Sequence, residues 1–456
     1  MRALTTWLRR LVLSCALMSA CTGLASAQEM RLSLPEARAA SARMLQAGKP
    51  EAALILAEGV LLGAPGDVEG LLLKARALQE LGKHRDARKS AKLAWSVSNT
   101  DRDRFYAAMV QAGTLVSNGQ KGYAQYWLRR AAQVAPEERL RGAAVQDFRK
   151  LRRATPWRLH LGLTFAPSDN LNGGAKNEST DINGFTVRPG ARPLSGLRYG
   201  LNADFSYRVP ISRNTRLKFG ANIEVTRAEL SSDARATDPD AKNNDFREDS
   251  FGLSLDYEAR GKTGWLASAG VDLTHNTRRG EGFSNVKALR LFYGRMVMPG
   301  VTGSARAEWR HETLVHGSGN DLTTQEIGLA LGKQFDMGRL RLDAWFSDTN
   351  SDLYMVANET TGAQLSFSKT RAVKGMLPRV ALSYRDIDYD NAPFAFLSDM
   401  TRHDTEWKLS VDVLLPKVDF YGFAPEIGLS FRDRGSNYGI YDSQSTDLRL
   451  GIKSVF

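Results

Sequence analysis

Apolar and polar residues alternate one by one from about Pro156 to the end of the chain. The first such stretch reads WRLHLGLTF over residues 157–165, and the alternation returns at 216–225, 251–257, 340–346, 407–413 and 448–452. A period of two places the apolar side chains on one face of a β-strand and the charged or small side chains on the other. Each stretch is long enough to cross a bilayer, but a soluble β-sandwich also alternates, so this pattern alone does not decide between them.

The connections between these segments decide the fold class. About fourteen segments follow one another from Trp157. Long connections are expected near 169–195, 230–247, 279–284, 352–360, 390–402 and 435–443, and short ones at 211–214, 261–264, 299–300, 336–338 and 377–378. An even strand number with alternating short turns and long loops is typical of bacterial outer-membrane barrels. The sequence therefore predicts a transmembrane antiparallel β-barrel of about 14 strands over residues 154–456. Its terminal Phe456 fits the signal read by the barrel assembly machinery.

A barrel of this size encloses a lumen rather than a packed core. The alternation points a set of polar and charged side chains inward: Arg158, Asn202, Asp204, Lys218, Glu224, Asp256, Glu308, Arg310, Arg341, Asp343, Lys408 and Arg449. Residues 154–456 carry no net formal charge. Two interpretations stay open: the charges pair and fill the space, or they line a hydrated pathway.

An internal repeat precedes the barrel between about Leu34 and Pro136. Three glycines, Gly48, Gly82 and Gly119, each stand five residues before an alanine (Ala53, Ala87, Ala124) and seventeen before a helix stopper (Pro65, Asn99, Pro136). The spacing of 34 and then 37 residues is close to the tetratricopeptide period, with glycine in the turn and a small residue at the helix crossing. We expect an all-α tetratricopeptide-like solenoid over residues 28–153, a fold that usually binds peptides or protein surfaces.

The first 27 residues predict export. A basic head with Arg9 and Arg10 precedes an apolar run, and Ala25-Ser26-Ala27 forms a small-residue cleavage site. Both cysteines lie in this segment, so a chain cut after Ala27 has no thiol and no cysteine-based metal site. Met18-Ser19-Ala20-Cys21 is an alternative, lipoprotein-type cleavage site, which leaves lipidation of Cys21 open.

The basic excess of the chain lies in its helical third. The whole chain carries a formal net charge of +12, and residues 28–153 account for 9 of these charges. Behind an export signal, outer-membrane lipid or an acidic client protein is a better partner than nucleic acid. A cluster of Arg149, Lys150, Arg152 and Arg153 immediately precedes the barrel. It is either a solvated helix face or a surface that contacts membrane or client.

Two short segments of the predicted barrel carry a family resemblance. One is Ala166-Pro167-Ser168-Asp169-Asn170-Leu171-Asn172, at the exit of the first strand. The other is the closing hairpin from Pro425, with Ser436, Asn437 and the terminal Phe456. With helical repeats before a barrel of about fourteen strands, these motifs resemble the surface lipoprotein assembly modulator family. The resemblance implies an outer-membrane translocator that delivers surface lipoproteins or related secreted proteins, with the barrel as conduit and a periplasmic helical domain that contacts the client.

Other functions receive less support from the sequence. No nucleophile motif, metal-ligand spacing or phosphate loop accompanies the six histidines, so we expect neither enzymatic activity nor a cofactor. An exopolysaccharide exporter also joins helical repeats to a barrel, although such exporters usually carry more than three repeats. A general porin has no use for a solenoid. Both stay open as alternatives to protein translocation.

Overall fold

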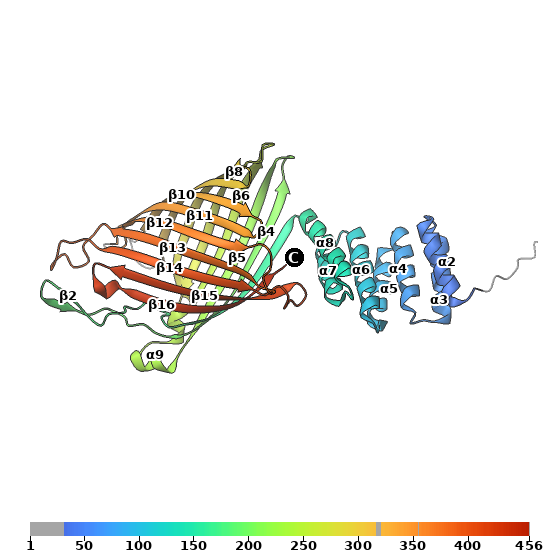
Figure 1. Cartoon of the computed structure of the whole chain (residues 1–456), viewed down its shortest axis with the longest axis horizontal. Coiled ribbons are helices and arrows are strands. Elements are labelled where there is room, and N and C mark those ends of the chain that lie inside the picture. Colours follow the sequence, from blue (N-terminus) through green and yellow to red (C-terminus); the bar gives the residue numbers. More distant parts are fainter. Residues whose placement is uncertain (1–31, 316–320, 354, 456) are drawn as a thin grey trace, which may run out of the picture. The chain divides into compact units, whose positions relative to one another are not determined.

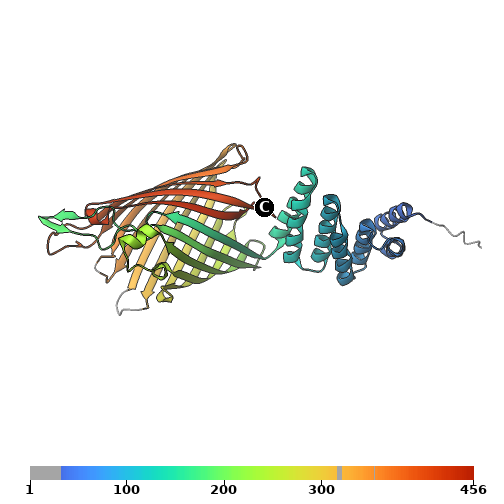
Figure 2. The same ribbon diagram turned by 90° about the horizontal axis from the view of Figure 1, so that it is seen from below.

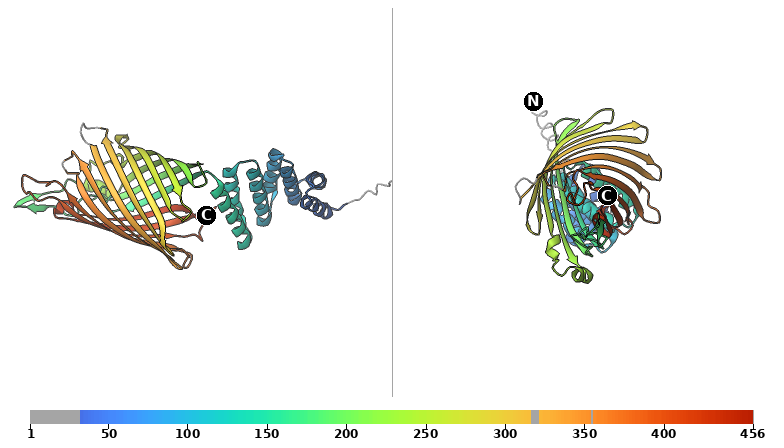
Figure 3. Two further views of the ribbon diagram at one scale, coloured as in Figure 1. Left: turned by 90° about the horizontal axis from the view of Figure 1, so that it is seen from above. Right: turned by 90° about the vertical axis from the view of Figure 1, so that its left-hand side faces the viewer.

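The computed structural model describes residues 32–315, 321–353 and 355–455. The predicted signal peptide, Cys21 and Phe456 lie outside these ranges. Two compact units divide the chain between Trp127 and Leu128. One holds most of the helices, and the other holds a large strand barrel (Figures 1 to 3).

The helices follow the predicted repeat. They are α2 (Leu34–Gln46), α3 (Pro50–Gly63), α4 (Val68–Glu80), α5 (His84–Val97), α6 (Asp101–Ser117), α7 (Lys121–Val134) and α8 (Glu138–Ala154). Gly48, Gly82 and Gly119 follow α2, α4 and α6 with φ values of 67°, 71° and 73°, a left-handed conformation that glycine adopts without steric cost. The alanines five residues later, Ala53, Ala87 and Ala124, are fully buried. The tetratricopeptide-like solenoid is therefore confirmed.

Small residues allow the solenoid helices to approach closely. Ala75 of α4, Ala91 of α5 and Val110 of α6 form one buried cluster. At the same crossing Gln79 accepts a hydrogen bond from the Thr114 hydroxyl at 3.2 Å, which satisfies a polar group close to the core. No helix of the described residues is long and apolar enough to cross a membrane.

The second unit contains a closed antiparallel barrel of fourteen strands, as predicted. The barrel strands are β1 (Trp157–Ser168), β4 (Gly196–Pro210), β5 (Thr215–Leu230), β6 (Glu248–Arg260), β7 (Leu266–Arg278), β8 (Glu281–Met298), β9 (Val301–Leu314), β10 (Asp321–Phe335), β11 (Gly338–Ser351), β12 (Asn358–Lys369), β13 (Leu377–Tyr389), β14 (His403–Leu414), β15 (Phe423–Ser436) and β16 (Ser443–Ser454). Each strand pairs with its neighbours in sequence, and β1 meets β16 to close the barrel.

The outer wall is apolar. Along β1, for example, Leu159, Leu161 and Leu163 are 51%, 55% and 44% exposed, while Arg158 and His160 take the opposite face. Exposed leucines in continuous rows are what a lipid-facing wall requires. The unit is thus an outer-membrane-type barrel.

The connections confirm the predicted asymmetry and correct two of its details. The three longest connections, residues 169–195, 231–247 and 390–402, lie at one end of the barrel, the loop end, whereas the connections at the other end, the turn end, are two to eight residues long. The loop predicted at 279–284 is a two-residue turn, because Arg279 and Gly280 both take positive φ and close a tight hairpin. The turn predicted at 377–378 is also wrong: Leu377 begins β13, and the reversal occurs at Lys374 and Gly375. A sixth turn-end connection, residues 415–422, was not predicted.

The longest loop carries a small hairpin of β2 (Thr180–Ile182) and β3 (Phe185–Val187). Ile182 packs with Tyr438 and Ile440, and the Tyr438 hydroxyl donates to the Met400 carbonyl at 2.6 Å. Leu171 and Leu194 form a second cluster with Leu230 and with Ala234 of α9 (Ser232–Thr237). The loops are therefore packed against one another rather than independent.

Candidate functional site: the charged lumen and the β1–β16 seam

Ion pairs cover the inner wall of the barrel. Lys218 of β5 and Arg290 of β8 both contact Asp256 of β6, at 3.1 and 3.0 Å. Similar contacts join Arg306 to Glu326, Arg341 to Asp343, Arg385 and Arg434 to Glu406, and Arg449 to Asp412. Many of the inward charges thus neutralise one another, within a strand or between strands, and the lumen has a polar lining.

The seam between β1 and β16 differs from the other strand interfaces. Its register comprises Thr164↔Gly451, Phe165↔Leu450 and Ser168↔Asp447. Each of the other neighbouring pairs of barrel strands is registered at eleven or more positions. All three seam positions lie in the loop-end half of β1. The barrel is therefore closed firmly at one end of this seam only.

The first family-like motif holds the closed end of the seam. Asp169 accepts a hydrogen bond from the Thr446 backbone N–H at 2.7 Å, and the buried Asn170 donates to the carbonyl of Gln444 at 2.9 Å. Asn172 accepts from the Leu194 N–H at 3.0 Å and so shapes the return of the same loop. Pro167 lies within β1 opposite Leu197. The motif residues thus connect the exit of the first strand to the last strand.

The second motif organises the connection between β15 and β16. The Ser436 N–H donates to Asp442 at 2.7 Å, across the base of this loop. Asn437 accepts from the His403 N–H at 2.9 Å and donates to the Thr401 carbonyl at 2.8 Å. The structure therefore places both motifs at the loop end, near each other through β16. Phe456 lies beyond the described residues.

The four residues of the basic cluster of α8 differ in exposure. Arg149, Lys150 and Arg153 are exposed, and Lys150 pairs with Asp147 at 3.6 Å. Arg152 is half-buried near the Phe148 ring. Burial lowers the pKa of Arg152, and the charge of Arg158 lowers it further, which places Arg152 apart from its three neighbours.

Arg129 of α7 is a functional candidate that the sequence did not suggest. Its guanidinium lies between the rings of Phe148 and Phe423, 4.5 and 4.4 Å from their centroids. It donates to the Tyr421 carbonyl at 2.8 Å and to the Ser454 hydroxyl at 2.9 Å. Burial, and then the charge of Arg152, lower its pKa to about 10, with Asp419 opposing them.

Two further contacts extend this attachment. Arg141 of α8 donates to Asp419 at 2.6 Å, and Gln133 of α7 accepts from the Tyr421 N–H at 2.7 Å. These residues all belong to the unit that begins at Leu128. The end of α7 and the whole of α8 are therefore attached to the 415–422 connection and the end of β16. No sequence pattern pointed to the contact of Arg129 with Tyr421, because no acidic residue stands close to Arg129 along the chain.

Replacing this arginine is expected to loosen the attachment. In Arg129→Ala, two charge-assisted hydrogen bonds and two cation–ring contacts are lost, about 3 kcal/mol in total. Hydrogen exchange of the Tyr421 amide should accelerate at least tenfold in the mutant. The exposed Arg149→Ala is the matched control, and equal exchange in the two variants would contradict the role of Arg129.

The C-terminal part of the chain is similar to a known protein family. Residues 345–456 match the family model described as surface lipoprotein assembly modifier. The match confirms the resemblance over the last six barrel strands, from within β11 to the end of the chain. It includes Ser436 and Asn437 of the second motif. The first motif lies outside residues 345–456, but it contacts Thr446 and Gln444 within them.

Solved structures give more distant similarities. A loop L8 deletion mutant of OmpT, an outer membrane protein of Vibrio cholerae, is 8% identical, covers 66% of this chain and 99% of its own, and has a TM-score of 0.34. The type III secretion translocator chaperone SycD of Yersinia enterocolitica is 17% identical over 28% of this chain and 91% of its own, with a TM-score of 0.24. A comparison with curated proteins finds no match.

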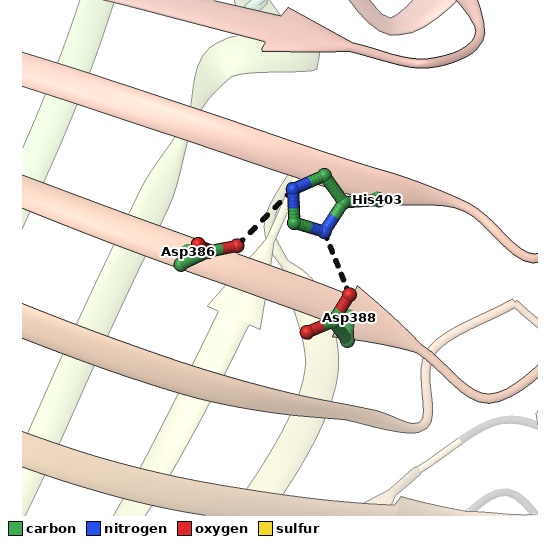
Figure 4. Close-up of side chains that lie close together, drawn as sticks. All are labelled: Asp386, Asp388 and His403. Atoms are coloured by element: carbon green, nitrogen blue, oxygen red, sulfur yellow. Dashed lines mark hydrogen bonds and ion pairs between the residues drawn. The ribbon is translucent and has the colours of Figure 1, made fainter.

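The matched residues 345–456 also contain a cluster of Asp386, Asp388 and His403 on the outer wall near the loop end (Figure 4). The imidazole Nδ1 lies 2.6 Å from Asp388, and Nε2 lies 3.2 Å from Asp386. Their ligand atoms are close enough together to hold a cation. A protonated imidazole satisfies both carboxylates at once, however, because each ring nitrogen then donates. The arrangement therefore needs no metal ion.

Proposed function

We propose that this chain is an outer-membrane translocator that delivers surface lipoproteins, or related secreted proteins, across the outer membrane. The match of residues 345–456 to the surface lipoprotein assembly modifier carries the proposal. It is supported by the closed fourteen-strand barrel with an apolar outer wall. The tetratricopeptide-like solenoid is suited to hold a protein client, a use for which a porin has no need.

In this proposal the helical domain lies in the periplasm. The first residue of the first barrel strand, Trp157, and the last residue of the last one, Ser454, both lie at the turn end. In bacterial barrels this end faces the periplasm. The solenoid would then receive the client before it meets the barrel. The periplasm supplies no ATP, so the transport that we propose uses neither nucleotide nor cofactor, and we propose no enzymatic role for the chain.

The exposed basic residues of α8 offer a separate test of membrane or client contact. Reversing Arg149, Lys150 and Arg153 to Glu should weaken binding of the purified protein to anionic vesicles, or to its client, about tenfold, since each reversal replaces attraction with repulsion. Co-sedimentation with vesicles and pull-down with the client measure the two effects. Unchanged binding in both assays would assign these side chains to a solvated helix face.

Surface display tests the function itself. Cells with and without this gene are compared by protease shaving and mass spectrometry of the proteins encoded beside it. We expect one neighbouring protein to leave the surface and accumulate in the periplasm when the gene is deleted. If instead no protein moves and a capsule or exopolysaccharide is lost, polysaccharide export replaces protein translocation.

A further inference from the structure

The turn-end half of β1 has a free backbone edge. β1 pairs with β4 along its whole length, from Trp157 to Ser168, but its register with β16 begins only at Thr164. Continuing that register would place Leu163 opposite Ile452 and Leu161 opposite Ser454. Neither pair is formed in the described part of the seam.

The end of β16 is held on its other side. The Val455 N–H donates to the Gly422 carbonyl at 2.9 Å, and Arg129 holds the Ser454 hydroxyl. These contacts tie the strand end to β15 and to the 415–422 connection. The edge of β1 over residues 157–163 therefore has no registered partner on β16. Unpaired backbone groups at membrane depth are costly, and a strand edge is a template for another extended segment.

Arginines without acidic partners stand beside this edge on the lumen side. Arg158 forms no ion pair within the described ranges. On the neighbouring strand, the Nε of Arg208 is buried and has no hydrogen-bond partner among the described residues. Glu258, the acid that acts on Arg208, is itself paired with Arg216. The inward carboxylate of β4, Asp204, stands opposite His160, whereas Arg158 stands opposite Ser206, so the positive charge beside this edge lies toward its turn end.

We propose that the free edge of β1, residues 157–163, binds an extended acidic segment of the client by strand addition. Main-chain hydrogen bonds from the segment would complete the open half of the seam. Every second side chain of an added strand faces the lumen, where carboxylates would meet Arg158 and Arg208. The intervening side chains face the lipid and would be apolar. This site rests on the proposed translocator function but has its own test.

A disulfide across the seam tests the edge directly. Both native cysteines lie in the predicted signal peptide, so introduced pairs are the only thiols in the cleaved chain. Leu163→Cys with Ile452→Cys locks the open half. Phe165→Cys with Leu450→Cys is the matched control, because these outward residues already pair two positions along the same strands. Heat-modifiable migration on gels selects the folded, cross-linked protein for each measurement.

The probe is a labelled seven-residue peptide of alternating glutamate and valine, added to the full-length protein in uncharged detergent. We expect binding to fall at least tenfold in the oxidised open-half lock, to return with reductant, and to be unchanged in the control lock. Arg158→Gln with Arg208→Gln should weaken binding at least fivefold. Replacing the exposed Arg235 of α9 at the loop end, in Arg235→Gln, should leave binding unchanged.

Equal binding to the locked protein would overturn the site, as would equal binding of a lysine–valine peptide. If the peptide binds only when anionic lipid is present, and equally well in the locked protein, Arg158 and Arg208 bind lipid. This result would also overturn the edge site. If a client disappears from the surface on gene deletion while the peptide never binds, the translocator function stands and the edge site falls. If the peptide binds but no client depends on the gene, the function falls.

Discussion

Deleting residues 28–120 is expected to leave a folded barrel and to reduce surface display of the client at least tenfold. The barrel should fold because residues 128–456 form their own compact unit with a closed strand order. The deletion removes α2 to α6, and with them the repeat surface that would hold the client. It keeps α7 and α8, so the contacts of Arg129 and Arg141 with the 415–422 connection are retained. Heat-modifiable gel migration measures folding, and protease shaving measures display.

A longer deletion, of residues 28–153, supplies the comparison. It removes Arg129, Gln133 and Arg141 as well, so it should also loosen the 415–422 connection. If both deletions abolish display but only the longer one destabilises the barrel, client docking and barrel support belong to different helices. Normal display by the shorter deletion would show that the solenoid is not needed for delivery.

Replacing Glu406 by Gln is expected to destabilise the barrel by about 3 kcal/mol. Glu406 is 3% exposed and lies among three arginines: Arg385, Arg432 and Arg434. Removing its charge leaves three guanidinium groups with one neutral amide between them, and breaking a buried pair in this way typically costs 3–5 kcal/mol. The midpoint of urea unfolding in lipid vesicles measures the loss.

Asp412→Asn is the control for this variant. Among the residues that the structure describes, Asp412 pairs with Arg449 only and is more exposed than Glu406, so its loss leaves one cation beside solvent. We expect a loss of about 1 kcal/mol or less, as for other exposed pairs. Equal effects of the two substitutions would mean that the arginine cluster is not held together by Glu406.

The seam also gives the two sequence motifs a physical role. Asp169 and Asn170 bond directly to backbone groups of β16, while Asn437 secures the start of β14. These short polar side chains replace strand pairing where the chain leaves the barrel wall. They hold the loop end of the seam closed while its turn end stays unpaired. The first motif therefore begins on the same strand, β1, that carries the free edge.

Local patterns were sufficient for the elements and their faces. Strict alternation predicted which side of β1 faces outward, because a strand repeats every two residues and only one wall meets lipid. The three glycines predicted the solenoid turns, since each takes a positive φ that other residues avoid. The sequence analysis misplaced two turns. Arg279 and Lys374 take positive φ there, and these residue types, unlike glycine, do not indicate such a conformation.

Contacts between distant segments were decided only by the tertiary structure. Asp388 and His403 meet because β13 and β14 pair in one register, and a shift of one residue would put them on opposite faces. Arg129 reaches Tyr421 across 292 positions of sequence. The unpaired half of the β1–β16 seam depends on where two chain ends meet as the barrel closes. The sequence alone determined the helical repeat and the strand alternation, because these depend on neighbouring residues. The charge balance of the wall and the open seam required the closed fold, because both depend on which strands become neighbours.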